Sequence, residues 1–362
     1  MWRHTGIGRY IDQLLSQLDP AWRATAWVAP DDVAAVQARW PQVAIAPCPA
    51  PLFSLREQRF WPQALARHAI GLFHAPHLNA PLLSRVPLVV TVHDLIPLHH
   101  PGTIGRPGGA LAFGAMARWV PARAQAVLTH SQATREDLVT RLGLAPERIT
   151  VVPLAADTRL ARPQPAARLA ALRARFGLEG RFVLYIGQWK PYKNLETLLA
   201  ACVALPEDVR VVLAGRCDPG ATHLPAAIAR HGLGPRVVLT DWLDDDDLAA
   251  LLQAASLFAF PSCREGFGLP PLEAMAAGVP VLCSEAPGLR EAVGEAAWRL
   301  PVRDVAAWQA ALRRTLADEP LRAGLIAAGL RHAASRSWAA VAQETQAVYR
   351  RVARASGPSR AW

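Results

Sequence analysis

Short apolar runs alternate with amphipathic stretches along nearly the whole chain. The runs are rich in β-branched residues and lack a polar face; they lie at 86–92, 126–131, 182–187, 209–215, 236–241, 257–262 and 279–284. Between them lie segments with helical periodicity, such as "LETLLAACVAL" (195–205). Buried strands that alternate with helices are typical of parallel sheets covered on both faces. The pattern predicts an α/β protein.

One segment, 157–178, interrupts the alternation. Pro163 and Pro165 break it before a new strand begins at Phe182. We therefore expect two Rossmann-like, doubly wound parallel-sheet domains, 1–160 and 161–336, facing each other across a cleft. In such sheets ligands bind at the carboxyl ends of the strands.

Composition narrows the class of partner. The formal net charge of +10 favours an anion: a nucleotide, a phospholipid surface or nucleic acid. Zinc-finger spacing, an RNA-binding aromatic pattern and a basic tail are all missing from the sequence, which argues against nucleic acid. The sequence has neither an apolar run of about 18 residues nor a signal peptide, so we expect a cytoplasmic protein with reduced cysteines.

The chain has two lysines, Lys190 and Lys193, both within "GQWKPYKNLE" (187–196). Every other basic residue among the 39 Lys and Arg is arginine. This clustering is either chance or a sign that a compact ammonium is needed to meet a phosphate.

The segment "PSCREGFGLPPLEAMAAGVPV" (261–281) predicts a strand end, a glycine-containing loop and a helix that starts near Pro270 and Pro271. Free N–H groups at a helix start bind anions, and carboxylates accept hydrogen bonds from sugar diols. Glu265 precedes the loop, and we expect Glu273 in the first helical turn. The pattern suits a nucleotide sugar. Equally, Glu273 can be a helix-dipole carboxylate and the glycines a plain turn.

Two further clusters could be mistaken for metal sites. "DDDD" (244–247) precedes a helical stretch, where Asp is favoured as the cap. His74 and His77 lack a nearby carboxylate or thiolate to complete a tetrahedral site. We expect no metal at either place.

"EGFGLPPLEAMAAGVPV" resembles the E-x7-E signature of retaining family 4 glycosyltransferases, which have the GT-B fold. Six more segments match that family in the same order: "GIGRY" (6–10), "VTVHDLIPL" (90–98), "THSQATREDL" (129–138), "VVPLAAD" (151–157), "YIGQWKPYKNLETLL" (185–199) and "SWAAVAQETQAVYR" (337–350). The resemblance implies a C-terminal helix, within 337–362, that crosses back to the first domain.

The resemblance also implies roles in the donor site. Glu265 would bind the transferred sugar and Glu273 the ribose, while Lys193 would neutralise the diphosphate. Gly266, Phe267, Gly268 and Leu269 would offer backbone groups to sugar and phosphate. Lys190 either adds a second charge, in a chain with Gln188 where many relatives have arginine, or is a solvated loop lysine.

The first domain would contribute three residues. His93, after the strand 86–92, would contact the sugar near its reacting carbon, although a lone histidine beside a strand is often structural. Gly6 and Gly8 would form a loop near the diphosphate, with Arg9 structural.

The implied reaction is retaining, metal-independent transfer of a sugar from a nucleotide diphosphate donor, without a cofactor. GDP-mannose is the expected donor, with UDP-sugars as the alternative. The acceptor would be a glycan or a polyprenyl-diphosphate-linked sugar of cell-surface polysaccharide assembly. The E-x7-E context argues against a nucleotide-sugar 2-epimerase. The other alternative is a catalytically silent partner that binds a nucleotide sugar.

Two expectations concern the first domain. Segments 53–68 and 110–125 are basic and apolar, so they would either rest on the anionic inner face of the plasma membrane or be ordinary amphipathic helices. Relatives begin with a buried strand before "TGIGRY", and this chain starts almost on that segment. We expect the recorded start to lie too late.

Overall fold

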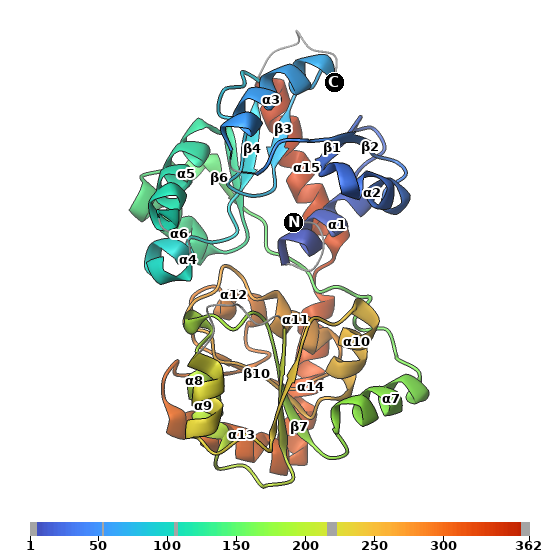
Figure 1. The fold of residues 1–362 in the computed structure, drawn as a ribbon, viewed down its shortest axis with the longest axis vertical. Coiled ribbons are helices and arrows are strands. Elements are labelled where there is room, and N and C mark those ends of the chain that lie inside the picture. The colour runs from blue at the N-terminus through green and yellow to red at the C-terminus, as the bar shows by residue number, and fades with distance from the viewer. Residues whose placement is uncertain (1–5, 53, 105–107, 216–222, 356–362) are drawn as a thin grey trace. The chain divides into compact units, whose positions relative to one another are not determined.

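The structure is a computed structural model that describes residues 6–52, 54–104, 108–215 and 223–355. The chain divides into two compact units (Figure 1). The N-terminal unit comprises 1–95, 107–153 and 338–362, and the C-terminal unit 96–106 and 154–337. Three stretches thus differ from the sequence boundaries: 96–106, 154–160 and Ser337 all group with the C-terminal unit.

The C-terminal unit contains a six-stranded parallel sheet in the order β12-β11-β10-β7-β8-β9. Its strands are β7 (Phe182–Ile186), β8 (Arg210–Ala214), β9 (Val237–Thr240), β10 (Leu257–Phe260), β11 (Val281–Ser284) and β12 (Trp298–Leu300). Chain order reverses between β7 and β10, which pair with Leu257 opposite Val183. This is the Rossmann strand order, and ligands bind outside the carboxyl ends of the strands at such a reversal.

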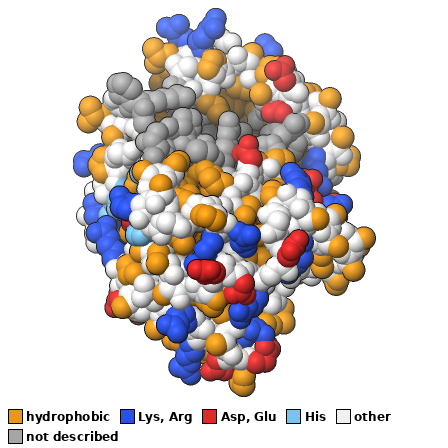
Figure 2. Space-filling view, turned by 60° about the horizontal axis from the view of Figure 1, so that its bottom comes forward, with side chains coloured by type: hydrophobic (Ala, Val, Ile, Leu, Met, Phe, Trp, Pro, Cys, Tyr) orange, Lys and Arg blue, Asp and Glu red, His pale blue; other side chains and the backbone are white. Residues whose placement is uncertain are grey.

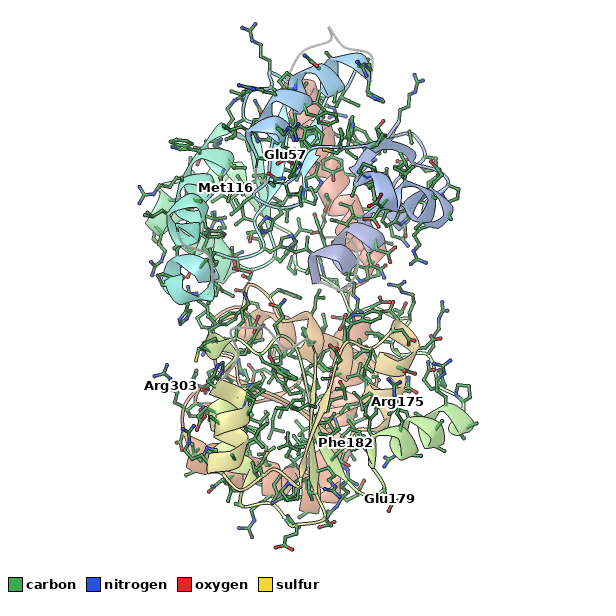
Figure 3. All side chains as sticks on the ribbon, in the orientation of Figure 1. Glu57, Met116, Arg175, Glu179, Phe182 and Arg303 are labelled. Carbon is green, nitrogen blue, oxygen red and sulfur yellow. The ribbon has the colours of Figure 1, made fainter. Side chains whose placement is uncertain are left out.

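Helices cover both faces of this sheet. The helices of this unit are α7 (Ala166–Phe176), α8 (Leu195–Cys202), α9 (His223–Arg230), α10 (Asp245–Ala254), α11 (Leu269–Ala276), α12 (Leu289–Val293), α13 (Val305–Ala317) and α14 (Glu319–Ala334). The short helix α4 (Ile96–His99) lies in the separate segment 96–106, and 3₁₀ turns lie at Pro101–Thr103 and Pro191–Lys193. Figure 1 shows α8 and α9 on one side of β7 and β10, and α7 and α10 on the other. Figure 3 labels Phe182, buried at the start of β7, and Arg175 of α7, which pairs with Asp247 of α10 at 2.8 Å. Asp244 caps α10 by accepting from the Asp247 N–H at 2.7 Å, as the sequence predicts.

The N-terminal unit is also built from parallel strands. They are β1 (Thr25–Val28), β2 (Ala44–Pro47), β3 (Phe73–Ala75), β4 (Leu88–Thr91), β5 (Ala126–Thr129) and β6 (Ile149–Val151). Within the described ranges they form two sheets, β1-β2 and β3-β4-β5-β6, where the sequence predicts one doubly wound sheet. The helices are α1 (Gly6–Ser16), α2 (Val33–Arg39), α3 (Leu55–Arg67), α5 (Gly109–Arg123) and α6 (Gln132–Leu142), with 3₁₀ turns at Pro30–Asp32 and Pro146–Arg148.

The last helix, α15 (Trp338–Ala355), packs against α1 and β5 of the N-terminal unit. Gln346 Oε1 accepts from the Asp19 N–H at 3.0 Å, and Tyr349 bonds to His74 of β3 at 2.6 Å. The chain therefore returns from the C-terminal unit to complete the N-terminal core, and α15 is the crossing helix that the family resemblance implies.

Charge is mixed on the face drawn in Figure 2. Basic and acidic side chains are interspersed there among apolar ones. On the described side chains of that face, the net charge of +10 is not gathered into one basic field.

Candidate functional site

Two loops meet at the strand-order reversal of the C-terminal unit: 187–194 after β7 and 261–268 after β10. The Cys263 N–H donates to the Tyr192 carbonyl at 2.8 Å, which links them directly. The Asn194 amide, next in the chain after Lys193, donates to the carbonyls of Pro261 (3.1 Å) and Val302 (2.7 Å). These bonds fix both loops at the sheet edge where a ligand is expected.

Lys193 and Glu265, predicted from separate motifs, form an ion pair across these loops. Nζ lies 2.7 Å from Oε1, and the side chains are 12% and 10% exposed. The ammonium also lies 5.1 Å from the ring centre of Tyr192 and 5.3 Å from that of Phe260. Burial acts to lower the pKa of Lys193, but the Glu265 carboxylate prevails and raises the pKa above its ordinary value. Lys193 is therefore a permanent positive charge.

The backbone around Glu265 is closely packed. Gly288, at φ 85°, lies so near that an added Cβ would fall 2.3 Å from the Glu265 carbonyl oxygen. The Glu265 N–H donates to the Pro287 carbonyl at 3.4 Å. The segment before α12 therefore supports the loop that carries the carboxylate.

Helix α11 begins at Leu269 with Gly268 as its cap at φ 121°. Pro270 and Pro271 occupy its first turn and have no N–H group. The backbone donors for an anion at this helix start are therefore confined to the loop glycines, Phe267 and Leu269, a smaller set than a helix start normally offers.

Glu273 is the fifth residue of α11 and is 3% exposed. The prediction that it lies in the first turn is wrong, because the helix starts at Leu269, one residue before the prolines. Its position further along the helix also weakens its interpretation as a helix-dipole carboxylate, since that effect falls off within the first turn.

Lys190 is half-buried, and its Nζ donates to the Thr103 carbonyl at 3.2 Å. Nearby, the Tyr192 ring stacks on His100 with the ring centres 6.0 Å apart. His100 and Thr103 therefore contact the loop after β7, and Lys190 is bonded within the protein, so it is not a fully solvated loop lysine.

In the N-terminal unit, His93 follows β4, and both of its ring nitrogens are engaged. Nε2 lies 2.8 Å from the Pro76 carbonyl oxygen, and Nδ1 lies 3.0 Å from Nε2 of His130. Burial, then His130, lowers the pKa of His93 well below its ordinary value. The Tyr10 ring lies edge-on to His93, with the centres 5.3 Å apart.

Gly6 and Gly8 lie in the first turn of α1, so the predicted loop is a helix start. Tyr10, two residues after Gly8, bonds through its hydroxyl to Thr91 Oγ1 at 3.1 Å. This places the first turns of α1 at the carboxyl end of β4, beside His93.

Sequence reasoning missed His130 and Tyr10. The available signal was position: His130 comes directly after β5, at the sheet edge where His93 follows β4. The rule that functional residues follow parallel strands applies to His93 and His130.

Comparison with known proteins agrees with this geometry. The family model described as Glycosyltransferase Family 4 matches residues 4–160, and the one described as Glycosyl transferases group 1 matches 173–332. The chain belongs to the GT-B glycosyltransferases.

Among curated relatives, the chain is 32% identical to the serotype-specific mannosyltransferase WbdA of Escherichia coli, over 69% of this chain and 32% of WbdA. It is 33% identical to the MMP alpha-(1->4)-mannosyltransferase of Mycolicibacterium hassiacum, over 73% of this chain and 65% of the relative. The chain thus spans about one third to two thirds of these relatives. The solved structure of Anabaena HepE in complex with UDP-glucose matches with a TM-score of 0.80 and 19% identity, covering 97% of each chain, which shows the shared fold.

Proposed function

We propose that this GT-B glycosyltransferase transfers mannose from GDP-mannose to a glycan acceptor of cell-surface polysaccharide assembly, with retention at the anomeric carbon. The observation that carries the proposal is the Lys193–Glu265 pair at the strand-order reversal. The mannosyl donor is supported by relatives whose names describe mannosyltransferases.

Lys193 and Glu265 would bind different parts of the donor. Lys193 would meet the charge that develops on the leaving diphosphate, aided by the backbone N–H groups of Gly268 and Leu269. Glu265 would accept hydrogen bonds from hydroxyls of the transferred sugar, and Glu273 from those of the ribose. An ion pair that is already 2.7 Å apart presents both functions side by side before the donor arrives.

Retention would follow from attack on the face that the diphosphate leaves. The acceptor oxygen forms its bond to the anomeric carbon as the bond to the phosphate oxygen breaks, and that phosphate oxygen takes the acceptor's proton. His93 would act near the reacting carbon through its backbone carbonyl, since both ring nitrogens are already bonded.

We further propose that transfer needs no metal ion, because Lys193 supplies the compact positive charge that a divalent ion would otherwise provide at a diphosphate. A thermal-shift titration with GDP, UDP and ADP, each with and without EDTA, tests donor and metal together. Stabilisation by GDP that survives EDTA supports both proposals. Stabilisation by UDP alone would mean that the donor is a UDP-sugar and not GDP-mannose. A rise in melting temperature that EDTA abolishes would refute metal independence.

Turnover is tested with GDP-mannose and glycan acceptors, by following GDP release and the configuration of the product. Donor binding without transfer to any acceptor would contradict the proposal and favour a silent nucleotide-sugar-binding protein.

We propose that the acceptor is a sugar linked to polyprenyl diphosphate, which would reside in the membrane. We also propose that the N-terminal unit contacts the anionic surface of that membrane. Leu55 at the start of α3 is 80% exposed, and Leu111 and Trp119 of α5 are 83% and 67% exposed, among arginines of the same helices. Apolar side chains flanked by arginine favour anionic bilayers. Within the described residues, no helix is both long and apolar enough to cross a bilayer.

Vesicle co-sedimentation tests this contact. Wild type should bind vesicles containing phosphatidylglycerol, and L111S/W119S should bind them less, while neither should bind phosphatidylcholine alone. Equal binding of both proteins would contradict the proposed surface.

A further inference from the structure

Two imidazoles face each other at the carboxyl ends of β4 and β5. His93 Nδ1 and His130 Nε2 are 3.0 Å apart. Their outer nitrogens each meet a backbone carbonyl: His93 Nε2 lies 2.8 Å from the Pro76 oxygen, and His130 Nδ1 lies 3.0 Å from the Val152 oxygen.

The carbonyls determine where the ring hydrogens are. A carbonyl oxygen only accepts, so each outer nitrogen must carry a hydrogen. A neutral imidazole has one N–H, and in two neutral rings both facing nitrogens would therefore present lone pairs. In two protonated rings, both would present N–H groups. A hydrogen bond at 3.0 Å requires one proton between them, and therefore one positive charge on the pair.

We propose that His93 and His130 hold a single proton in common, and that His130 is a positioning residue that fixes the His93 ring. The proton is taken up from water as pH falls and is returned to water as pH rises. In the proton-bearing form Nδ1 of His93 is bonded to His130; in the proton-free form the facing lone pairs repel and one ring must turn.

The surroundings decide which ring turns. His130 is 2% exposed, whereas His93 is half-buried and so has more room to move. The His93 ring is therefore the one that turns. Other titratable groups face the pair from neighbouring elements: Tyr10 of α1, His74 of β3 and His77 beyond it, whose ring is stacked 6.2 Å from His93. Tyr349 of α15 reaches the cluster through His74.

These surroundings set the pH range. Burial lowers the pKa of His130 to about 4, and burial followed by the charge of His130 lowers that of His93. The facing lone pairs act the other way, because the proton relieves their repulsion. The two rings should therefore titrate together, with one apparent pKa that belongs to the pair.

The consequence for transfer rests on the proposed function. The pair carries its charge beside the first turns of α1, to which Tyr10 links it, where the resemblance places the donor diphosphate. Because both ring nitrogens of His93 are already bonded, His93 would contribute the positive charge of the pair to the site and would not transfer a proton to or from the substrate. Turnover should then fall as pH rises through the apparent pKa of the pair.

Nuclear magnetic resonance of the full chain, with ¹⁵N-labelled histidine and titrated over the pH range in which it stays folded, tests the proton directly. We expect His93 and His130 to change together and to take up one proton in total, with a far-downfield hydrogen signal in the proton-bearing form. H130Q keeps a hydrogen bond, since its amide can donate to the neutral His93 Nδ1, but it removes the need for a proton. Uptake at His93 should fall from one shared proton to none.

His332 provides the matched control, because its Nε2 lies 2.8 Å from the Ala292 carbonyl in the C-terminal unit. H332Q should leave the pair's titration unchanged. Independent titration of His93 and His130, or His93 titrating in H130Q as in wild type, would overturn the proposal whether or not the protein transfers mannose. If the pair titrates as expected but turnover has the same pH profile in wild type and H130Q, only the link to transfer is refuted.

Discussion

At the scale of single residues, Lys193 and Glu265 depend on each other because each is nearly buried. We expect E265A to lower the free energy of unfolding by about 2–4 kcal/mol, since removing one partner leaves the other charge buried without compensation. Urea unfolding at pH 7.5 measures this. K193M/E265L, which removes both charges, should cost less than E265A alone; an equal or larger cost would show that the charges are not coupled.

The same pair should dominate turnover. K193A is expected to reduce kcat by about 10²–10³-fold, the size of effect seen when one electrostatic group at a leaving oxygen is lost. K193R is the matched variant, and it should restore only part of kcat because a planar fork does not replace a compact ammonium. Wild-type kcat in K193A would remove Lys193 from the mechanism.

His74 should make stability depend on pH. Its ring lies between Tyr349 Oη (2.6 Å) and Thr91 Oγ1 (2.8 Å), and burial, then His130, lowers its pKa to about 3. Below the ordinary value of 6.5 the unfolded chain therefore binds a proton that the folded chain does not, and stability falls as pH falls. The contribution is about 2 kcal/mol at pH 5.

The test compares urea unfolding at pH 7.5 and pH 5. H74Q should lose less stability than wild type over this interval, although it is less stable at pH 7.5. H68Q, at an exposed histidine that follows α3, should behave like wild type. An identical pH dependence in H74Q and wild type would show that His74 is not kept neutral by burial.

At the scale of elements, the loop 261–268 after β10 depends on the close approach of Gly288 to its backbone. G288A would place a Cβ 2.3 Å from the Glu265 carbonyl oxygen at a positive φ, so we expect a loss of stability of at least about 2 kcal/mol and weakened GDP binding. G177A is the control: φ is also positive, but no atom lies within 4 Å of the added Cβ, so about 1 kcal/mol should be lost and GDP binding retained. Equal effects of both variants on binding would contradict a role for this packing.

The sequence predicted some elements well and others poorly, for physical reasons. Runs such as 182–187 and 257–262 became β7 and β10 because a strand buried on both faces leaves a continuous apolar signal. The prolines indicated the start of α11 to within one residue, an error large enough to misplace Glu273. His130 was missed because its importance lies in contacts with His93 and Val152, which are distant in sequence.

At the scale of the whole molecule, chain order does not determine which unit a segment joins. The sequence assigned 96–106 to the first domain by position, yet Lys190 and Tyr192 contact that segment within the C-terminal unit. The crossing of α15 was foreseen from a resemblance; its amphipathic pattern alone could not say which unit it covers.

The return of α15 leads to a prediction about which part of the molecule a C-terminal change destabilises. Val341 is fully buried on the face of α15 that packs on the N-terminal unit, and V341D would place an unpaired charge there. We expect amide hydrogens of β4 and β5 to exchange much faster, while those of β7 and β8 keep wild-type protection. Ala347, exposed on the same helix, supplies the control variant A347D, which should change neither. Faster exchange in β7 and β8 of V341D would mean that α15 stabilises both units, and that the N-terminal core is not its principal site of action.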